Sequence, residues 1–95
     1  MNILWLETAQ DDLNALTDYI AEDSPQQALQ IFSTIRQSVD ELAIFPSAGR
    51  EGRVGQTREL VIPRLPYIAV YLVTREVQIL AILHTSRKWP VAFEA

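Results

Sequence analysis

A glycine-rich basic loop is the first part of the sequence that could bind an anionic partner. Segment 47–56 contains all three glycines of the chain together with Arg50 and Arg53. Glycines let a backbone approach a partner closely, and arginines offer planar, multidentate contacts to carboxylates or phosphates. The same residues also fit a structural loop in which the arginines are solvated or paired with Glu51 and Glu59. The loop lacks the Gly-Lys-Ser/Thr ending of a phosphate-binding loop, so a nucleotide site is not expected.

A second cluster surrounds His84, which is the only histidine of the chain. It is followed closely by Arg87, Lys88 and Trp89. A histidine at a strand end can act as a general base, and an arginine can stabilise developing negative charge. An indole can stack on a base or fill a pocket of a partner. The structural alternative is that His84 is hydrogen-bonded to backbone and that Trp89 closes one end of the core.

Other kinds of chemistry have little support in the sequence. The chain has no cysteine, which removes disulfides, thiolate metal sites and cysteine nucleophiles and favours a reducing compartment. The second half has no further histidine and no carboxylates at ligand spacing, so neither a metal nor another cofactor is expected. Acidic residues interrupt the chain from Glu7 onward, and no signal peptide or membrane span is recognisable. We therefore expect a cytoplasmic protein without a membrane partner.

Charge is distributed unevenly along the chain, whose formal net charge is −4. Residues 1–45 contain eight Asp or Glu against the single Arg36, whereas residues 46–95 contain seven Lys or Arg against four Glu. An anionic partner should therefore meet the second half. The overall acidity argues against direct nucleic-acid binding, which requires several Lys and Arg residues to neutralise phosphates.

Two helices are predicted to position these clusters. A short strand at 2–6 leads into Thr8-Ala9-Gln10-Asp11, which has the form of a capping box at the start of the first helix. Ser24 and Pro25 predict the start of the second helix, and Pro46 its end. The apolar stripe of the second helix has the candidate members Ala28, Ile31, Phe32, Ile35, Val39, Leu42 and Phe45. The two helices should form a hairpin that faces a common core.

Three β-rich segments follow the helices, at 57–62, 67–74 and 77–84. Their short connections predict an antiparallel meander. The run 67–73 is almost entirely apolar, which is typical of a central strand covered on both sides. The predicted order is β-α-α-β-β-β, an α+β fold with an antiparallel sheet packed against an N-terminal helical hairpin. The length favours a single domain over 1–95.

Short motifs along almost the whole chain occur in a recognisable order and spacing. Those of the first half are Trp5, Ala9, Asp12-Leu13, Tyr19-Ile20-Ala21, Pro25, Ala28, Phe45-Pro46 and Gly49-Arg50. The strongest stretch consists of Gly52-Arg53-Val54, the segment 57–62, Pro66-Tyr67-Ile68, Tyr71, Ile79-Leu80, His84, Arg87 and Trp89-Pro90. Together these motifs resemble the RelE/ParE superfamily of type II toxin–antitoxin toxins, and its ParE-like branch in particular.

The resemblance implies a toxin that is neutralised by a cognate antitoxin, whose partly disordered segment folds across it. RelE-like members cleave mRNA on the ribosome without a metal, whereas ParE-like members inhibit DNA gyrase. The nuclease branch usually has an arginine directly after the first aromatic residue of the strand at 67–73, and this chain has Ile68 there. An apolar side chain cannot stabilise a cleaving phosphate. The lysine-rich surface expected of a ribosome-dependent nuclease is also absent, since Lys88 is the only lysine. The resemblance to the ParE-like branch therefore implies a gyrase inhibitor that acts by protein–protein contact and causes growth arrest.

Each hypothesis assigns its own residues. For the gyrase inhibitor no residue is catalytic, and the contacts to target or antitoxin are assigned to Arg50, Arg53, Arg58, Arg87, Lys88 and Trp89. The alternative is a metal-independent mRNA endoribonuclease that would use Arg58, His84 and Arg87. A third hypothesis is a non-toxic relic that only binds the antitoxin. For the gyrase inhibitor, no direct nucleic-acid binding is expected unless it occurs through the antitoxin complex.

Overall fold

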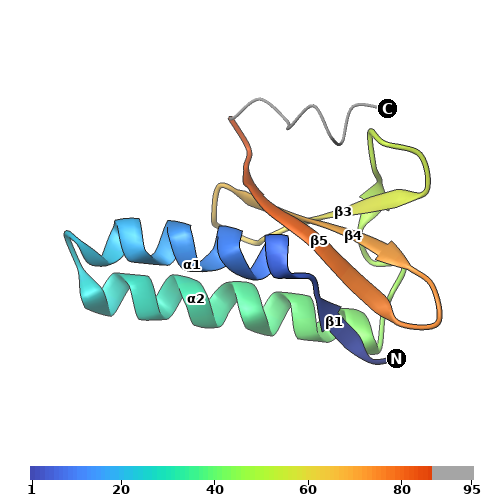
Figure 1. Cartoon of the computed structure of the whole chain (residues 1–95), viewed down its shortest axis with the longest axis horizontal. Helices are drawn as coiled ribbons and strands as arrows, with labels where there is room; N and C mark the ends of the chain where they lie inside the picture. Colours follow the sequence, from blue (N-terminus) through green and yellow to red (C-terminus); the bar gives the residue numbers. More distant parts are fainter. Residues whose placement is uncertain (87–95) are drawn as a thin grey trace.

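A computed structural model describes residues 1–86, in which a helical hairpin packs against one face of a five-stranded sheet (Figure 1). The elements in chain order are β1 (Ile3–Trp5), α1 (Glu7–Ala21), α2 (Pro25–Asp40), the 3-10 helix η1 (Glu41–Ala43), β2 (Arg50–Glu51), β3 (Thr57–Val61), β4 (Tyr67–Val73) and β5 (Val77–His84). The α+β class and the helical hairpin are thus confirmed. No helix in the described range is long and apolar enough to cross a membrane.

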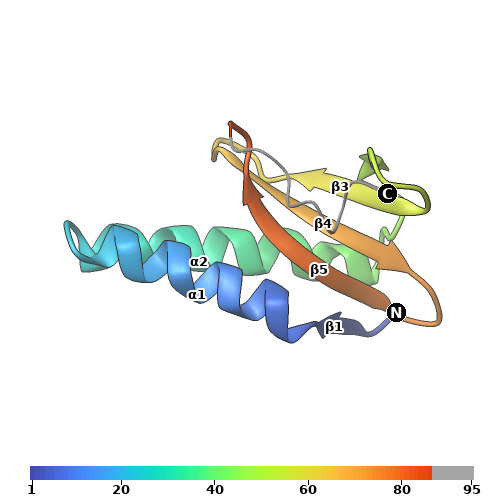
Figure 2. The same ribbon diagram turned by 45° about the horizontal axis from the view of Figure 1, so that its top comes forward.

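The sheet has the strand order β1-β5-β4-β3-β2. Strands β3, β4 and β5 form the expected antiparallel meander. Strand β1 adds a parallel edge to β5, so the sheet is mixed (Figure 2). At the opposite edge, the two-residue strand β2 pairs antiparallel with β3. Strand β2 lies within segment 47–56, which the sequence predicts only as a loop.

Strand β4 is the central strand of the meander, as its apolar sequence predicts. Ala69 and Tyr71 belong to the core shared with the helices. Ile68 and Val70 are buried on the opposite face of the sheet. Burial on both faces explains why this strand has almost no polar residue.

The apolar stripes of the two helices supply the other side of the main core. Its fully buried members include Ala9 and Leu13 of α1 with Ile35 and Val39 of α2. The prediction for Phe45 is wrong, because this side chain is 65% exposed. Helix α2 ends at Asp40 and η1 follows it, so the 3.6-residue periodicity no longer holds at position 45.

The two predicted helix starts have different outcomes. Ser24 caps α2 as expected, since its Oγ accepts a hydrogen bond from the Gln27 N–H at 3.1 Å. The capping box at Thr8 is wrong, because α1 begins at Glu7 with Leu6 as its N-cap. The Thr8 hydroxyl instead donates to the Leu80 carbonyl oxygen at 2.9 Å. The chain pairs with β5 as far as the Leu6 N–H, and α1 begins at the next residue. Thr8 therefore already lies inside the helix and cannot cap it.

Candidate functional site

The loop between η1 and β2 is held in one conformation by the Tyr71 hydroxyl. This hydroxyl donates to the Pro46 carbonyl oxygen at 2.8 Å and accepts from the Gly49 N–H at 2.8 Å. Burial raises the pKa of Tyr71, which keeps the hydroxyl protonated and able to donate. A Cβ atom on Gly49 would lie 2.6 Å from the Tyr71 hydroxyl oxygen, so only glycine fits here.

Glu59 forms ion pairs with both arginines of the loop, Arg50 and Arg53. Its carboxylate is 3% exposed and accepts from Arg50 Nη2 at 3.0 Å and from the Arg53 backbone N–H at 2.9 Å. The Arg53 guanidinium also lies 3.6 Å from this carboxylate. Burial favours protonation of Glu59, but the donors and charges of Arg53 and Arg50 together hold its pKa below the usual value. The pairing with Glu59 considered from the sequence is therefore present, and both arginine side chains stay at least half exposed.

Arg58 meets the same loop from the other face of the sheet, since consecutive strand residues point to opposite faces. Its Nη1 donates to the Gly49 carbonyl oxygen at 2.7 Å and lies 3.4 Å from that of Ser47. Three of the arginines predicted as contact residues thus surround one segment. We call residues 44–53, with the side chains of Arg58 and Glu59, the arginine loop.

A second candidate region is a groove between α1 and the carboxyl end of β5, with a volume of about 800 Å³. Leu16, Ile20 and Tyr67 contribute apolar lining, and Asp12 and His84 contribute polar lining. We call it the α1 groove. Helix α1 itself contains four acidic residues and no basic one.

Hydrogen bonds and ring packing fix His84 at the α1 groove. Its ring lies edge-on to that of Tyr67, with centroids 5.5 Å apart. Its Nδ1 accepts the Ser86 N–H at 3.1 Å and lies 2.8 Å from Ser86 Oγ. The backbone hydrogen bond of the structural alternative is therefore present.

Asp12 closes the edge of β5 beyond the end of β1. Its Oδ2 accepts a hydrogen bond from the Ile82 N–H at 3.1 Å. Burial raises the pKa of Asp12, and the neighbouring charge of Asp11 adds to this effect, while the Ile82 hydrogen bond opposes it. The charged neighbour of Asp12 is thus another carboxylate, whereas the charged neighbours of Glu59 are two arginines.

The residues proposed for a nuclease are not all brought together. Arg58 lies opposite Tyr71 on β4, whereas His84 lies opposite Tyr67. The two positions are therefore about 13 Å apart along the strands and about 10 Å apart across them, from standard strand dimensions. Arg87, Lys88 and Trp89 lie outside the described residues. Between residues 1 and 86 no group of three or more His, Cys, Asp or Glu could hold a metal ion.

Two residues that organise these regions were named from the sequence only as family motifs and not as candidate site residues. Tyr71 carries a polar hydroxyl in an apolar central strand, and a buried hydroxyl of this kind usually requires a partner. That signal could have pointed to hydrogen bonds of the Tyr71 hydroxyl, although not to Pro46 and Gly49 as the partners. We call these two hydrogen bonds the clamp. Asp12 fits the polar face of a helix, so nothing in its local pattern indicates the Ile82 contact.

Residues 3–89 match the family model described as the ParE toxin of the type II toxin–antitoxin system parDE. The chain belongs to this family. It is 40% identical over 88 residues to "Putative toxin Y4kP" of Sinorhizobium fredii, covering 93% of this chain and 92% of the relative. It is also 33% identical over 86 residues to "Toxin RelE2" of Caulobacter vibrioides, covering 90% of this chain and 96% of the relative.

A solved structure supports the same assignment to the ParE toxin family. A chain of the chromosomal ParDE toxin–antitoxin system from P. aeruginosa superimposes with a TM-score of 0.81 at 32% identity, covering 90% of this chain and 97% of that one. The ParE-like prediction is confirmed. This chain is the toxin of a type II toxin–antitoxin system.

Proposed function

We propose that this ParE-family toxin inhibits DNA gyrase by protein–protein contact and does not cleave mRNA. The observation that carries the proposal is the separation of Arg58 from His84, which places two of the three candidate nuclease residues in different regions. Ile68 adds support, because this apolar side chain is buried and offers no charge to a phosphate.

The arginine loop is the proposed contact surface for the target. Arg50 and Arg53 present half-exposed guanidinium groups whose positions are fixed by Glu59. A surface held in place before binding loses little conformational entropy when the complex forms. Arg58, Arg87, Lys88 and Trp89 complete the proposed set of contacts to target or antitoxin.

The partner proposed for the α1 groove is the cognate antitoxin. The groove has an apolar lining beside a helix that carries only negative charge. Residues 1–35 contain no lysine or arginine at all. The chemistry that fits is a basic amphipathic segment, which folds as its apolar face enters the groove.

Two assays with the purified toxin test the proposed activity. We expect inhibition of supercoiling by DNA gyrase and no cleavage of mRNA on ribosomes. The opposite pair of results would contradict gyrase inhibition and would transfer the activity to Arg58, His84 and Arg87. Normal growth of cells at verified toxin levels would favour the non-toxic relic.

The mRNA endonuclease is kept as a second candidate because one relative carries the name RelE2. If cleavage is found, Arg58→Ala and His84→Ala should each abolish it while leaving the toxin folded. Retained cleavage in both variants would exclude these two residues as the nuclease site.

A further inference from the structure

Ile44 and Phe45 form an exposed apolar pair directly after η1. Their exposed fractions are 74% and 65%. Packing within residues 1–86 does not account for a phenylalanine here, because its side chain is largely exposed. Phe45-Pro46 is nevertheless one of the motifs through which the sequence resembles its family. Pro46, by contrast, has a structural role through its hydrogen bond to Tyr71.

The backbone around this pair is fixed from several sides. The N–H groups of Ile44 and Phe45 both donate to the Glu41 carbonyl oxygen, at 3.1 and 3.0 Å. The Phe45 carbonyl oxygen accepts from the Ala48 N–H at 3.0 Å, and the amino terminus of Met1 donates to Ala43 at 2.7 Å. Two large apolar side chains are therefore displayed on a rigid support, which lowers the entropic cost of binding.

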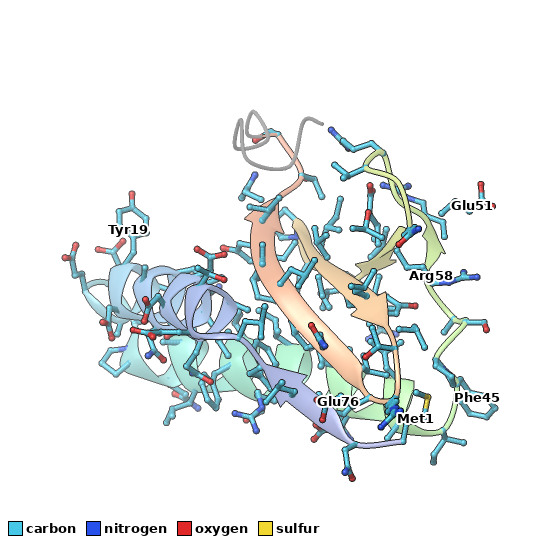
Figure 3. All side chains as sticks on the ribbon, turned by 45° about the vertical axis from the view of Figure 1, so that its right-hand side comes forward. Met1, Tyr19, Phe45, Glu51, Arg58 and Glu76 are labelled. Atoms are coloured by element: carbon cyan, nitrogen blue, oxygen red, sulfur yellow. The ribbon has the colours of Figure 1, made fainter. Side chains whose placement is uncertain are left out.

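The pair forms the amino-terminal end of the arginine loop and lies close to its arginines. Arg58 donates to the carbonyl oxygens of Ser47 and Gly49, only a few residues further along the chain. Phe45 and Arg58 project from the same edge of the molecule (Figure 3). Aromatic residues and arginines are the types enriched among the side chains that dominate protein–protein binding energy.

We propose that Ile44 and Phe45 are the apolar anchor that the toxin inserts into its target protein. The matching site on the target is an apolar pocket with carboxylates at its rim, which pair with Arg50 and Arg58. The inference rests on the proposed function, in which the toxin acts by protein contact. The α1 groove is the site proposed for the antitoxin, and its residue Tyr19 projects from the opposite side of the molecule (Figure 3). The partner assigned to Ile44 and Phe45 is therefore the target.

The test compares Phe45→Ser with Leu29→Ser. Leu29 is a matched control, since it is 69% exposed and lies on α2 away from the arginine loop. We expect Phe45→Ser to raise the toxin concentration for half-maximal inhibition of gyrase supercoiling about 30-fold, as for an interface hot spot. Leu29→Ser should leave it unchanged, and both variants should unfold at the wild-type temperature. Equal inhibition by Phe45→Ser and wild type would overturn the anchor.

Growth arrest after induction separates the anchor from the identity of the target. If the wild type arrests growth without inhibiting gyrase, the gyrase proposal fails, and loss of arrest in Phe45→Ser but not Leu29→Ser still supports the anchor. Full arrest by Phe45→Ser overturns the anchor. Full arrest combined with escape from the co-expressed antitoxin overturns it too and assigns the pair to the antitoxin. A wild type that neither arrests growth nor inhibits gyrase overturns both proposals.

Discussion

The helical hairpin and the arginine loop are built by different forces. Helices α1 and α2 are held on the sheet by periodic apolar side chains, such as Leu13 and Ile35, that share one core. The arginine loop is held by single polar side chains that reach its backbone from the sheet, chiefly Tyr71 and Glu59. Apolar packing is spread over many contacts, whereas the loop depends on a few hydrogen bonds. The loop should therefore be more sensitive to the loss of one polar atom.

The largest effect is expected for Tyr71→Phe, which removes one oxygen atom from the loop clamp. The buried Gly49 N–H and the part-buried Pro46 carbonyl oxygen both lose their partner. We expect the free energy of unfolding to fall by about 2 kcal/mol, the cost of leaving buried polar groups unsatisfied. Chemical denaturation measures this change.

Tyr67→Phe is the matched control on the same strand. Tyr67 lines the α1 groove, and no hydrogen bond of its hydroxyl is formed within the described part of the chain. Its loss should change the free energy of unfolding by less than about 0.5 kcal/mol. Equal losses in the two variants would contradict the clamp.

A smaller, pH-dependent effect is expected for Glu59→Gln. Because the folded pKa of Glu59 lies below its unfolded value, its stabilisation is present above the unfolded pKa and is lost as the pH falls through the folded pKa. At pH 7 we expect a loss of about 1.5 kcal/mol, typical of a hydrogen bond to a charged group. The difference from wild type should shrink in acid, as followed by denaturation over a pH series. A difference that does not depend on pH would show that the charge of Glu59 is unimportant.

The smallest effect, of opposite sign, is expected for Asp12→Asn in the α1 groove. The folded pKa of Asp12 is raised, so its charged form opposes folding and stability falls as the pH rises through that pKa. An asparagine oxygen can still accept from the Ile82 N–H without carrying charge. Thermal unfolding at pH 7 should show a slightly more stable variant. A less stable variant would mean that the carboxylate charge itself stabilises the edge of β5.

The sequence predicts the hairpin better than the loop because local signals define the hairpin. The cap at Ser24, the apolar stripes and the central strand at 67–73 all follow from spacing over a few residues. The clamp joins Tyr71 to Gly49, 22 positions away in the sequence, and to Pro46, 25 positions away. No local pattern can indicate contacts over such separations. Phe45 shows the limit clearly, since its spacing fits the stripe while the end of α2 places it outside the core.

In the proposed division of tasks, the arginine loop contacts the target and the α1 groove binds the antitoxin. Hydrogen–deuterium exchange of the toxin, measured with and without purified DNA gyrase, tests this division most directly. Gyrase should slow exchange in residues 44–59 and leave α1 unchanged. Protection of α1 without protection of residues 44–59 would contradict the claim.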